Sequence, residues 1–312
     1  MARGVYNPAP LKPMESSMRG ITWVATLVSL GMAVSVDAAV AFGPATVAPA
    51  AHEFTLGKLK LATLHDAQFV IPNDGKTFGV GADTAAVTNV LRAAGAPTDR
   101  ITLSVNALLV RMGHRVVLID TGIGQKAHGE LMGSLHETGV KPTAVTDVLI
   151  THSHGDHVGG LVDAEGHLAF PKATIRMSTT EWEFMQSKGS PDIAKAIAKK
   201  VHPFEPGAQV LPGIKSVPLQ GHTPGHTGYE ISSGSDHLLY IGDMAHSSIL
   251  SLAKPQWGVQ FDSDSAAAKA TRAATLKQLA GDQELVVSPH FPYPGVGHVE
   301  SAGDGFTWKP AH

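Results

Sequence analysis

Two kinds of hydrophobic spacing alternate along the chain after residue 56. Runs of β-branched and other apolar residues, several of them alternating with polar ones, predict strands. The predicted strands cover residues 59–64, 101–110, 115–119, 145–150, 173–177, 238–241 and 284–287. Helical spacing predicts helices over residues 83–94, from about Thr180 onward, and over residues 265–280. Strands that alternate with helices are typical of an α/β layered domain, so residues 56–312 are predicted to form one such domain.

The first 41 residues have a different pattern. Arg19 precedes an uncharged, mostly apolar stretch over residues 21–36, and small residues follow it. This order is typical of a secretory signal, so residues 1–41 are predicted to direct export, with a periplasmic or secreted mature protein that has no stable membrane span. A membrane anchor is the alternative, but the stretch is slightly short and contains Ser and Thr. Residues 42–55, which begin with many Ala, Gly and Pro, are predicted to be a linker.

The composition narrows the chemistry that the chain can perform. The 312 residues include no cysteine, which excludes disulfides, thiolate nucleophiles, thiolate zinc sites and iron–sulfur clusters. The formal net charge is −3, and no run of Lys and Arg is dense enough to predict a nucleic-acid partner. Histidine is frequent, with 17 residues concentrated in short clusters. Any metal must therefore be held by nitrogen and oxygen.

The densest histidine cluster follows a predicted buried strand. Residues 148–150 run directly into Thr151-His152-Ser153-His154-Gly155-Asp156-His157. In extended backbone His152 and His154 point the same way, and Gly155 lets the chain turn so that Asp156 and His157 approach from another side. One loop can thus present ligands to two neighbouring cations. The alternative, a surface cluster of polar residues, is disfavoured by four liganding side chains within six positions.

Further candidate ligands also stand where predicted strands end. His222 and His226 lie in Gly-His-Thr-Pro-Gly-His, Asp243 follows the strand at residues 238–241, and His290 follows the strand at residues 284–287. Each of them alone is more often a turn or capping residue. Ligands in α/β sheets bind outside the carboxyl ends of strands, however, so these residues are expected to converge on one crevice with the first loop.

These motifs together resemble the metallo-β-lactamase superfamily, in its two-metal branch. The resemblance rests on the His-x-His-x-Asp-His loop, on Gly-His-Thr-Pro-Gly-His, on Ile-Gly-Asp and on Ser-Pro-His, and it covers nearly all of the chain after residue 55. It implies an αββα sandwich with the metals at the rim between two sheets.

The resemblance also implies a role for each matching residue. By motif, the first metal would be held by His152, His154 and His222, the second by Asp156, His157 and His290, with Asp243 bridging both. Asp120, in Leu-Ile-Asp-Thr-Gly, would support the ligands from behind. His226 matches a motif position that is not a ligand, and it is expected to make a structural hydrogen bond.

A ligand set of imidazoles and carboxylates suits two divalent metal ions, which are expected to be zinc. Iron or manganese could bind to the same ligands. Two cations about 3.5 to 4 Å apart lower the pKa of a shared water to about 7, which supplies a bridging hydroxide as nucleophile. The expected reaction is therefore hydrolysis. Asp156 is also expected to be catalytic, by orienting the hydroxide or carrying its proton.

Further segments are similar to the secreted methyl parathion hydrolase group, namely residues 168–171, 212–215, 259–265 and 294–298. That group hydrolyses organophosphate triesters, and its relatives open lactones and cleave aryl esters. The resemblance therefore implies a small-molecule ester, lactone or organophosphate as substrate. The chain departs from the group at Ala127 and Met185, where aromatic residues line the pocket, and at His246, where an apolar residue is expected. Losing aromatic walls weakens the case for an aryl phosphate.

Candidate pocket walls are Trp182, Phe184, Met185, His246, Phe261, Phe291 and Tyr293. For the aromatic residues among them, core packing is an equally good explanation. Residues 69–78 are expected to form either a lid over the metals or a dimer contact. A homodimer is expected by analogy with the group.

Other functions stay open at this point. A glyoxalase-II-like thioester hydrolase would share the metal loop and would need a basic groove, for which Lys195, Lys199 and Lys200 are the clustered candidates. A β-lactamase would generally lack a bridging carboxylate such as Asp243. A non-catalytic metal-binding scaffold is disfavoured because all seven ligand positions carry liganding residues. The favoured expectation is a dinuclear metal hydrolase.

Overall fold

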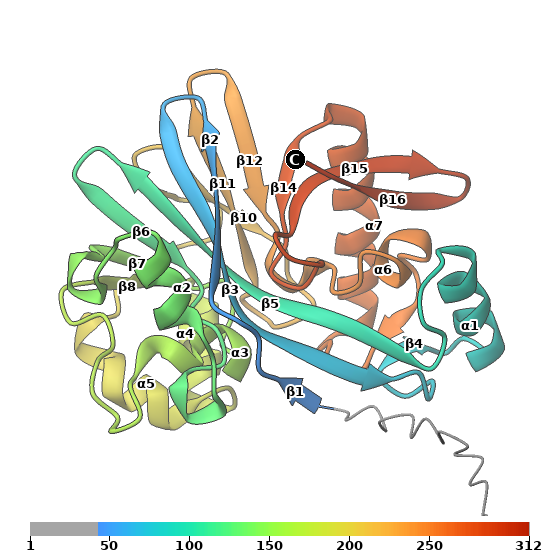
Figure 1. The fold of residues 1–312 in the computed structure, drawn as a ribbon, viewed down its shortest axis with the longest axis horizontal. Helices are drawn as coiled ribbons and strands as arrows, with labels where there is room; N and C mark the ends of the chain where they lie inside the picture. Colours follow the sequence, from blue (N-terminus) through green and yellow to red (C-terminus); the bar gives the residue numbers. More distant parts are fainter. Residues whose placement is uncertain (1–42, 312) are drawn as a thin grey trace, which may run out of the picture. The chain divides into compact units, whose positions relative to one another are not determined.

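Two mixed β-sheets face each other at the centre of the fold, which the computed structural model describes for residues 43–311 (Figure 1). The predicted export signal over residues 1–41 lies outside the described residues. The first sheet has the order β1-β3-β5-β6-β7-β8, and β2 also pairs with β3. Its strands are β1 (Gly43–Ala45), β2 (Ala50–Leu56), β3 (Leu59–Pro72), β5 (Arg100–Met112), β6 (Arg115–Ile119), β7 (Asp147–Leu149) and β8 (Thr174–Arg176).

The second sheet has the order β16-β15-β14-β12-β11-β10-β9. Its strands are β9 (Gln209–Leu211), β10 (Ile214–Pro218), β11 (Thr227–Ser233), β12 (Asp236–Tyr240), β14 (Leu285–Val287), β15 (Val296–Ala302) and β16 (Gly305–Pro310). A separate ribbon pairs β4 (Phe78–Val80) with β13 (Gly258–Val259). Parallel pairing is confined to β6 with β7, β7 with β8 and β12 with β14 among the described strands.

The longer helices cover the outer faces of the two sheets (Figure 1). The helices are α1 (Thr84–Ala93), α2 (Leu131–Glu137), α3 (Gly155–Val158), α4 (Thr179–Ser187), α5 (Pro191–Ile197), α6 (Leu250–Ala253) and α7 (Ser265–Asp282). Leu135 of α2, Met185 of α4 and Ile197 of α5 pack on the outer face of the first sheet. Leu252 of α6 and Leu276 of α7 pack on the outer face of the second.

A third apolar layer lies between the sheets. It joins Leu108 and Val117 of the first sheet to Tyr229, Leu238 and other residues of the second. Because successive residues of a strand point to opposite faces, a strand covered on both faces has buried side chains on both. This explains why every residue from 103 to 110 of β5 is buried. The layers run helix, sheet, sheet, helix, which confirms the predicted αββα sandwich.

The N-terminal part of the described chain differs from the prediction. Residues 42–55, expected to be a linker, contain β1 and most of β2, and β2 pairs with β3 from Ala50 opposite His65 to Leu56 opposite Leu59. The apolar alternation of β2 is weak because the strand lies beside β3 with partly exposed side chains, so its pattern resembles that of a linker. Among residues 43–311, no helix is both long and apolar enough to cross a bilayer.

Candidate metal centre

The first group of donor residues lies in the loop that follows β7. Strand β7 ends at Leu149, and His154, just before α3, has an extended backbone with φ and ψ of −69° and 155°. Helix α3 then begins at Gly155 and carries His157. His152 and His157 are buried, whereas His154 and Asp156 are partly exposed. His152 and His154 precede the turn into α3, and Asp156 and His157 follow it. The two pairs therefore approach the site from different directions.

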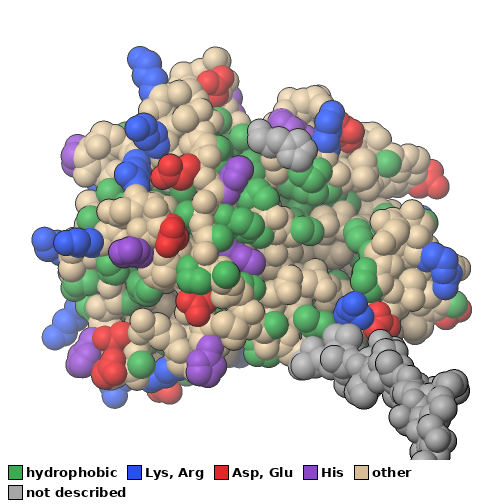
Figure 2. All heavy atoms as spheres, in the orientation of Figure 1, with side chains coloured by type: hydrophobic (Ala, Val, Ile, Leu, Met, Phe, Trp, Pro, Cys, Tyr) green, Lys and Arg blue, Asp and Glu red, His purple; other side chains and the backbone are tan. Residues whose placement is uncertain are grey.

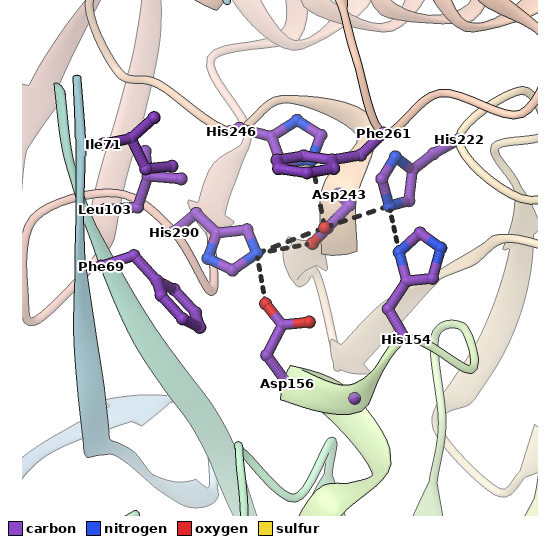
Figure 3. Close-up of a pocket in the computed structure, with 11 residues that line it drawn as sticks. Phe69, Ile71, Leu103, His154, Asp156, His222, Asp243, His246, Phe261 and His290 are labelled. Carbon is purple, nitrogen blue, oxygen red and sulfur yellow. Dashed lines mark hydrogen bonds and ion pairs between the residues drawn. The ribbon is translucent and has the colours of Figure 1, made fainter. Parts of the chain in front are cut away.

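The other donors come from three further loops that follow strands. His222 lies in the loop between β10 and β11, and Asp243 lies in a single 3-10 turn, Gly242–Met244, just after β12. His290 lies in the loop after β14. The structure brings these residues together with the first loop, as Figure 3 shows for most of them.

The seven residues fall into two groups. Within each group the candidate ligand atoms all lie within 4.8 Å of one another, and the groups are His152, His154, His222 and Asp243, and Asp156, His157 and His290. Asp243 also reaches the second group, because its Oδ1 lies 3.1 Å from both His157 Nε2 and His290 Nε2. Its Oδ2 lies 3.2 Å from His222 Nε2. The carboxylate of Asp243 therefore stands between the two groups.

Several buried atoms of this cluster have no hydrogen-bond partner within the protein. They include His157 Nε2, Asp243 Oδ1 and both ring nitrogens of His246. Buried polar atoms normally have partners, and an unpartnered set at one place indicates a bound ion or ligand. Imidazole nitrogens and carboxylate oxygens are ligands that suit divalent metals such as zinc. The donor set therefore fits two divalent metal ions.

Burial and mutual contact shift the pKa values of the cluster in opposite directions. Burial, with the neighbouring charge of His222, lowers the pKa of His154 to about 4. Burial also opposes a charge on His222, but its contacts with Asp243 and Asp262 raise its pKa to about 9. For Asp243, burial favours the neutral form, yet the imidazoles of His290 and His157 hold the pKa well below its usual value. A metal must displace such protons to bind, so metal affinity is expected to fall as the pH falls.

Two residues outside the donor groups fix the orientation of donors. Asp120 Oδ2 lies 2.8 Å from His157 Nδ1, and the same carboxylate accepts hydrogen bonds from the backbone and hydroxyl of Thr151 at 2.9 Å. His226 donates from Nδ1 to the carbonyl of Leu219 at 2.8 Å and accepts at Nε2 from the backbone N–H of Asp243 at 2.9 Å. Such contacts fix the tautomer and direction of a ligand ring or turn.

Glu181 was not singled out in the sequence, yet it connects the two histidine loops. It is fully buried on α4 and accepts hydrogen bonds from Ser153 N at 2.7 Å, Ser153 Oγ at 2.6 Å and Thr223 Oγ1 at 2.6 Å. Ser178, three residues earlier, caps the helix by accepting from Glu181 N. The Ser-x-x-Glu pattern is visible in the sequence, but it is typical of an ordinary capping box and gives no sign of the loops.

Asp262 is a second supporting carboxylate that sequence reasoning missed. His222 Nδ1 donates to Asp262 Oδ1 at 3.1 Å, which leaves Nε2 of that ring facing Asp243. Arg272, only 1% exposed, donates to Asp262 Oδ2 at 3.2 Å and to the carbonyl of Met244 at 2.9 Å. The pair thus holds both the His222 ring and the turn that carries Asp243. No local pattern could reveal it, because 40 residues separate His222 from Asp262.

A cavity of about 480 Å³ opens beside the donor groups. Phe69, Ile71 and Leu103 form an apolar wall on one side, and Phe261 lies across the cavity near His246 (Figure 3). The donors that line the cavity are His154, Asp156, His222, Asp243 and His290. Phe69 and Ile71 therefore belong to a cavity wall, whereas Phe78 is buried in the core beside α1.

Only two of the candidate pocket residues line the cavity. His246 and Phe261 line the cavity. The others lie elsewhere, because Met185 and Trp182 of α4 face the core under the first sheet, and Phe184 is half-buried on the same helix. Phe291 packs edge-on against Trp308 at 4.8 Å, and Tyr293 stacks on His65 at 4.7 Å. Ala127 is exposed and does not line the cavity either.

A family comparison identifies the class of protein that this fold and site define. The family model of the Metallo-beta-lactamase superfamily matches residues 100–290. The chain therefore belongs to the metallo-beta-lactamase superfamily.

Two solved structures are similar over most of the chain. AidC, a dizinc quorum-quenching lactonase in complex with the product N-hexanoyl-L-homoserine, has 29% identity and a TM-score of 0.79, with 85% of this chain and 98% of AidC covered. The hydrolase AbOPH, of the beta lactamase superfamily, has 27% identity and a TM-score of 0.78, with 86% of this chain and 99% of AbOPH covered.

Curated relatives match over shorter stretches. The uncharacterized protein YobT of Bacillus subtilis is 31% identical over 39% of this chain and 54% of YobT. Metallo-beta-lactamase domain-containing protein 1 of Xenopus laevis is 36% identical over 38% of this chain and 43% of that protein. The matches thus span about half the length of these curated relatives.

The Asp262 contact predicts a specific loss of metal affinity. Asp262→Asn removes the charge that orients the His222 ring, so the dissociation constant of a zinc ion held by His222 should rise about 10-fold or more. Competition with a chromophoric chelator measures this constant. Asp236→Asn, at an exposed position at the start of β12, is the matched control and should leave both constants unchanged. Equal constants in wild type and Asp262→Asn would show that the contact has no such role.

Proposed function

We propose that the protein is a two-zinc lactonase that opens small-molecule lactones bearing an apolar chain. The observation that carries this proposal is one cavity that combines a donor set for two metals with an apolar wall of Phe69, Ile71 and Leu103. The similarity to a dizinc lactonase over 85% of the chain supports the same substrate class. A lactone ring would lie over the donors, and its apolar chain would lie along the wall.

In this proposal the two donor groups hold the two ions. His152, His154 and His222 would hold one ion, and Asp156, His157 and His290 would hold the other. Asp243, which lies within 3.2 Å of histidines from both groups, would serve both ions. When bound, the two ions supply Lewis acidity and lower the pKa of water, so that hydroxide is available near neutral pH.

The chain's own residues then bind the substrate and move the proton. The side chain of Asp156 is 23% exposed, so a substrate in the cavity can reach it. Addition of water to the lactone carbonyl forms a new carbon–oxygen bond, and the ring carbon–oxygen bond then breaks. Asp156 accepts the proton of the attacking water and returns it to the leaving ring oxygen, which gives a hydroxy acid. The apolar wall excludes other water from the acyl side.

An organophosphate triester is a second candidate substrate. The phenyl rings of Phe69 and Phe261 face the cavity, so an aryl leaving group would meet aromatic walls despite the departures at Ala127 and Met185. This observation supports the resemblance to the methyl parathion hydrolase group. A thioester with an acidic carrier is less favoured, because Lys195, Lys199 and Lys200 lie on α5 and the turn after it and do not line the cavity.

Surface charge fits a small-molecule substrate better than a charged polymer. On the face drawn in Figure 2, Lys and Arg side chains are scattered among acidic ones and form no continuous basic field. We also propose that the protein is exported, on the pattern of residues 1–41, and that it forms a homodimer by analogy with its group. Fractionation of the native host and light scattering would test these two points.

The substrate class predicts an order of specificity constants. With zinc restored, kcat/KM should be highest for N-hexanoyl-homoserine lactone and at least 10-fold lower for phenyl acetate, a dialkyl aryl phosphate and an acyl thioester. A chelator should abolish all these activities and zinc should restore them. A zinc-loaded protein that hydrolyses the phosphate faster than the lactone would move the assignment to the triesterase class. No hydrolysis of any of the four would leave only a metal-binding role.

The proton-carrying role of Asp156 predicts a loss of kcat. In Asp156→Asn, assayed with zinc in excess and with metal content measured on the same sample, kcat for the lactone should fall about 100-fold or more. The amide keeps an oxygen for a metal but cannot take up a proton. Glu165→Gln, at an exposed acidic position, is the control and should retain the wild-type rate. A variant with full metal content and full rate would remove Asp156 from proton transfer.

A further inference from the structure

We propose that His246 is an additional metal donor, beyond the seven residues of the family pattern. His246 follows Asp243 by three positions and is only 2% exposed, yet neither of its ring nitrogens makes a hydrogen bond of good geometry. His157 Nε2 and Asp243 Oδ1, the other unpartnered atoms at this place, belong to the proposed metal ligands. His246 shares their environment and their lack of partners. The inference rests on the metal pair of the proposed function.

His246 lies as close to the carboxylate of Asp243 as the proposed ligand His222 does. His246 Nε2 lies 3.1 Å from Asp243 Oδ2, and His222 Nε2 lies 3.2 Å from the same oxygen. Two donors bonded to one zinc at about 2.0 to 2.1 Å are held roughly 3 Å apart, which matches both contacts. The ring of His246 is 4.8 Å from the ring of His222 and stacks on that of His290 at 5.6 Å. His246 therefore adjoins both donor groups (Figure 3).

Apart from Asp243 and the rings of His222 and His290, the aromatic neighbours of the ring are phenyl groups. The ring of Phe78 lies edge-on at 6.0 Å from the His246 ring, and the ring of Phe261 lies tilted at 6.4 Å. Neither offers a polar atom. The backbone behind the ring is fixed, because the N–H groups of His246 and Ser247 both donate to Ser251 Oγ. The backbone that carries the ring is thus held in place before any ion binds, and Nε2 of the ring lies beside Asp243.

An extra imidazole has consequences for metal choice. It would strengthen the hold on the ion beside His222, and it would favour metals that prefer nitrogen donors, such as zinc, over manganese. His246 lines the cavity, so as a metal donor it would also reduce the space that is left for substrate beside the ion.

Metal affinity without substrate tests the proposal directly. In His246→Leu, the dissociation constant of one of the two zinc ions should rise 10-fold or more in chelator competition, and that of the other should change little. His246→Gln, which keeps a polar atom at the end of the side chain, should recover part of the loss. Phe261→Leu changes the same cavity without removing a donor and should bind both ions as wild type does.

A second measurement uses the wild-type chain, so it does not require that any substituted protein folds correctly. In protein with nitrogen-15 in its histidines, zinc should shift the ring nitrogens of six residues, namely the five proposed histidine ligands and His246. Five shifted rings, or unchanged zinc constants in a folded His246→Leu, would overturn the inference. In that case wild-type protein with two zinc ions and lactonase activity would leave the proposed function intact, whereas wild-type protein that binds no zinc would overturn both.

Discussion

A buried carboxylate among imidazoles is the constraint on which this structure depends. Asp243 is 3% exposed and has five histidine nitrogens within 3.1 to 3.6 Å, and no Lys or Arg of the described chain pairs with it. A charge in such a place is costly unless it is paired or bound to metal. Two divalent ions would remove the repulsion among the imidazoles and satisfy the carboxylate at once. The sandwich brings four loops to one rim, and this arrangement makes the cluster possible.

The supporting residues indicate how the fold keeps these groups in place without an ion. Asp120 orients His157, Asp262 orients His222, and Glu181 joins the loops that carry them. Each support comes from a different part of the chain, so the site is braced by the first sheet, by α4 and by the segment before α7. Arg272 of α7 extends the bracing to the turn of Asp243. The precise direction of a ligand ring is set by such contacts more than by the ligand's own position in sequence.

The sequence predicts the parts of the site that local pattern controls. The donors are recognisable because each follows a short apolar strand, and the layers follow from strands that are apolar on both faces. The sequence does not predict the supporting roles of Asp262 and Glu181, because the residues that they contact are distant in sequence. The sequence predicts that the strand ends at residue 64 and leaves open whether residues 69–78 cover the metals or form a dimer contact. In the structure β3 continues to Pro72 and places Phe69 and Ile71 in the cavity wall. Apolar pattern alone also could not tell that Met185 faces a core and Phe261 a cavity.

Seven side chains are proposed to hold two metal ions, with Asp243 between the ions. Anomalous diffraction at the zinc edge from crystals of the metal-reconstituted protein tests this proposal most directly. Two zinc peaks are expected, one beside His152 and His222 and one beside His157 and His290, with Asp243 in contact with both. A single peak, or peaks away from these residues after reconstitution, would contradict it.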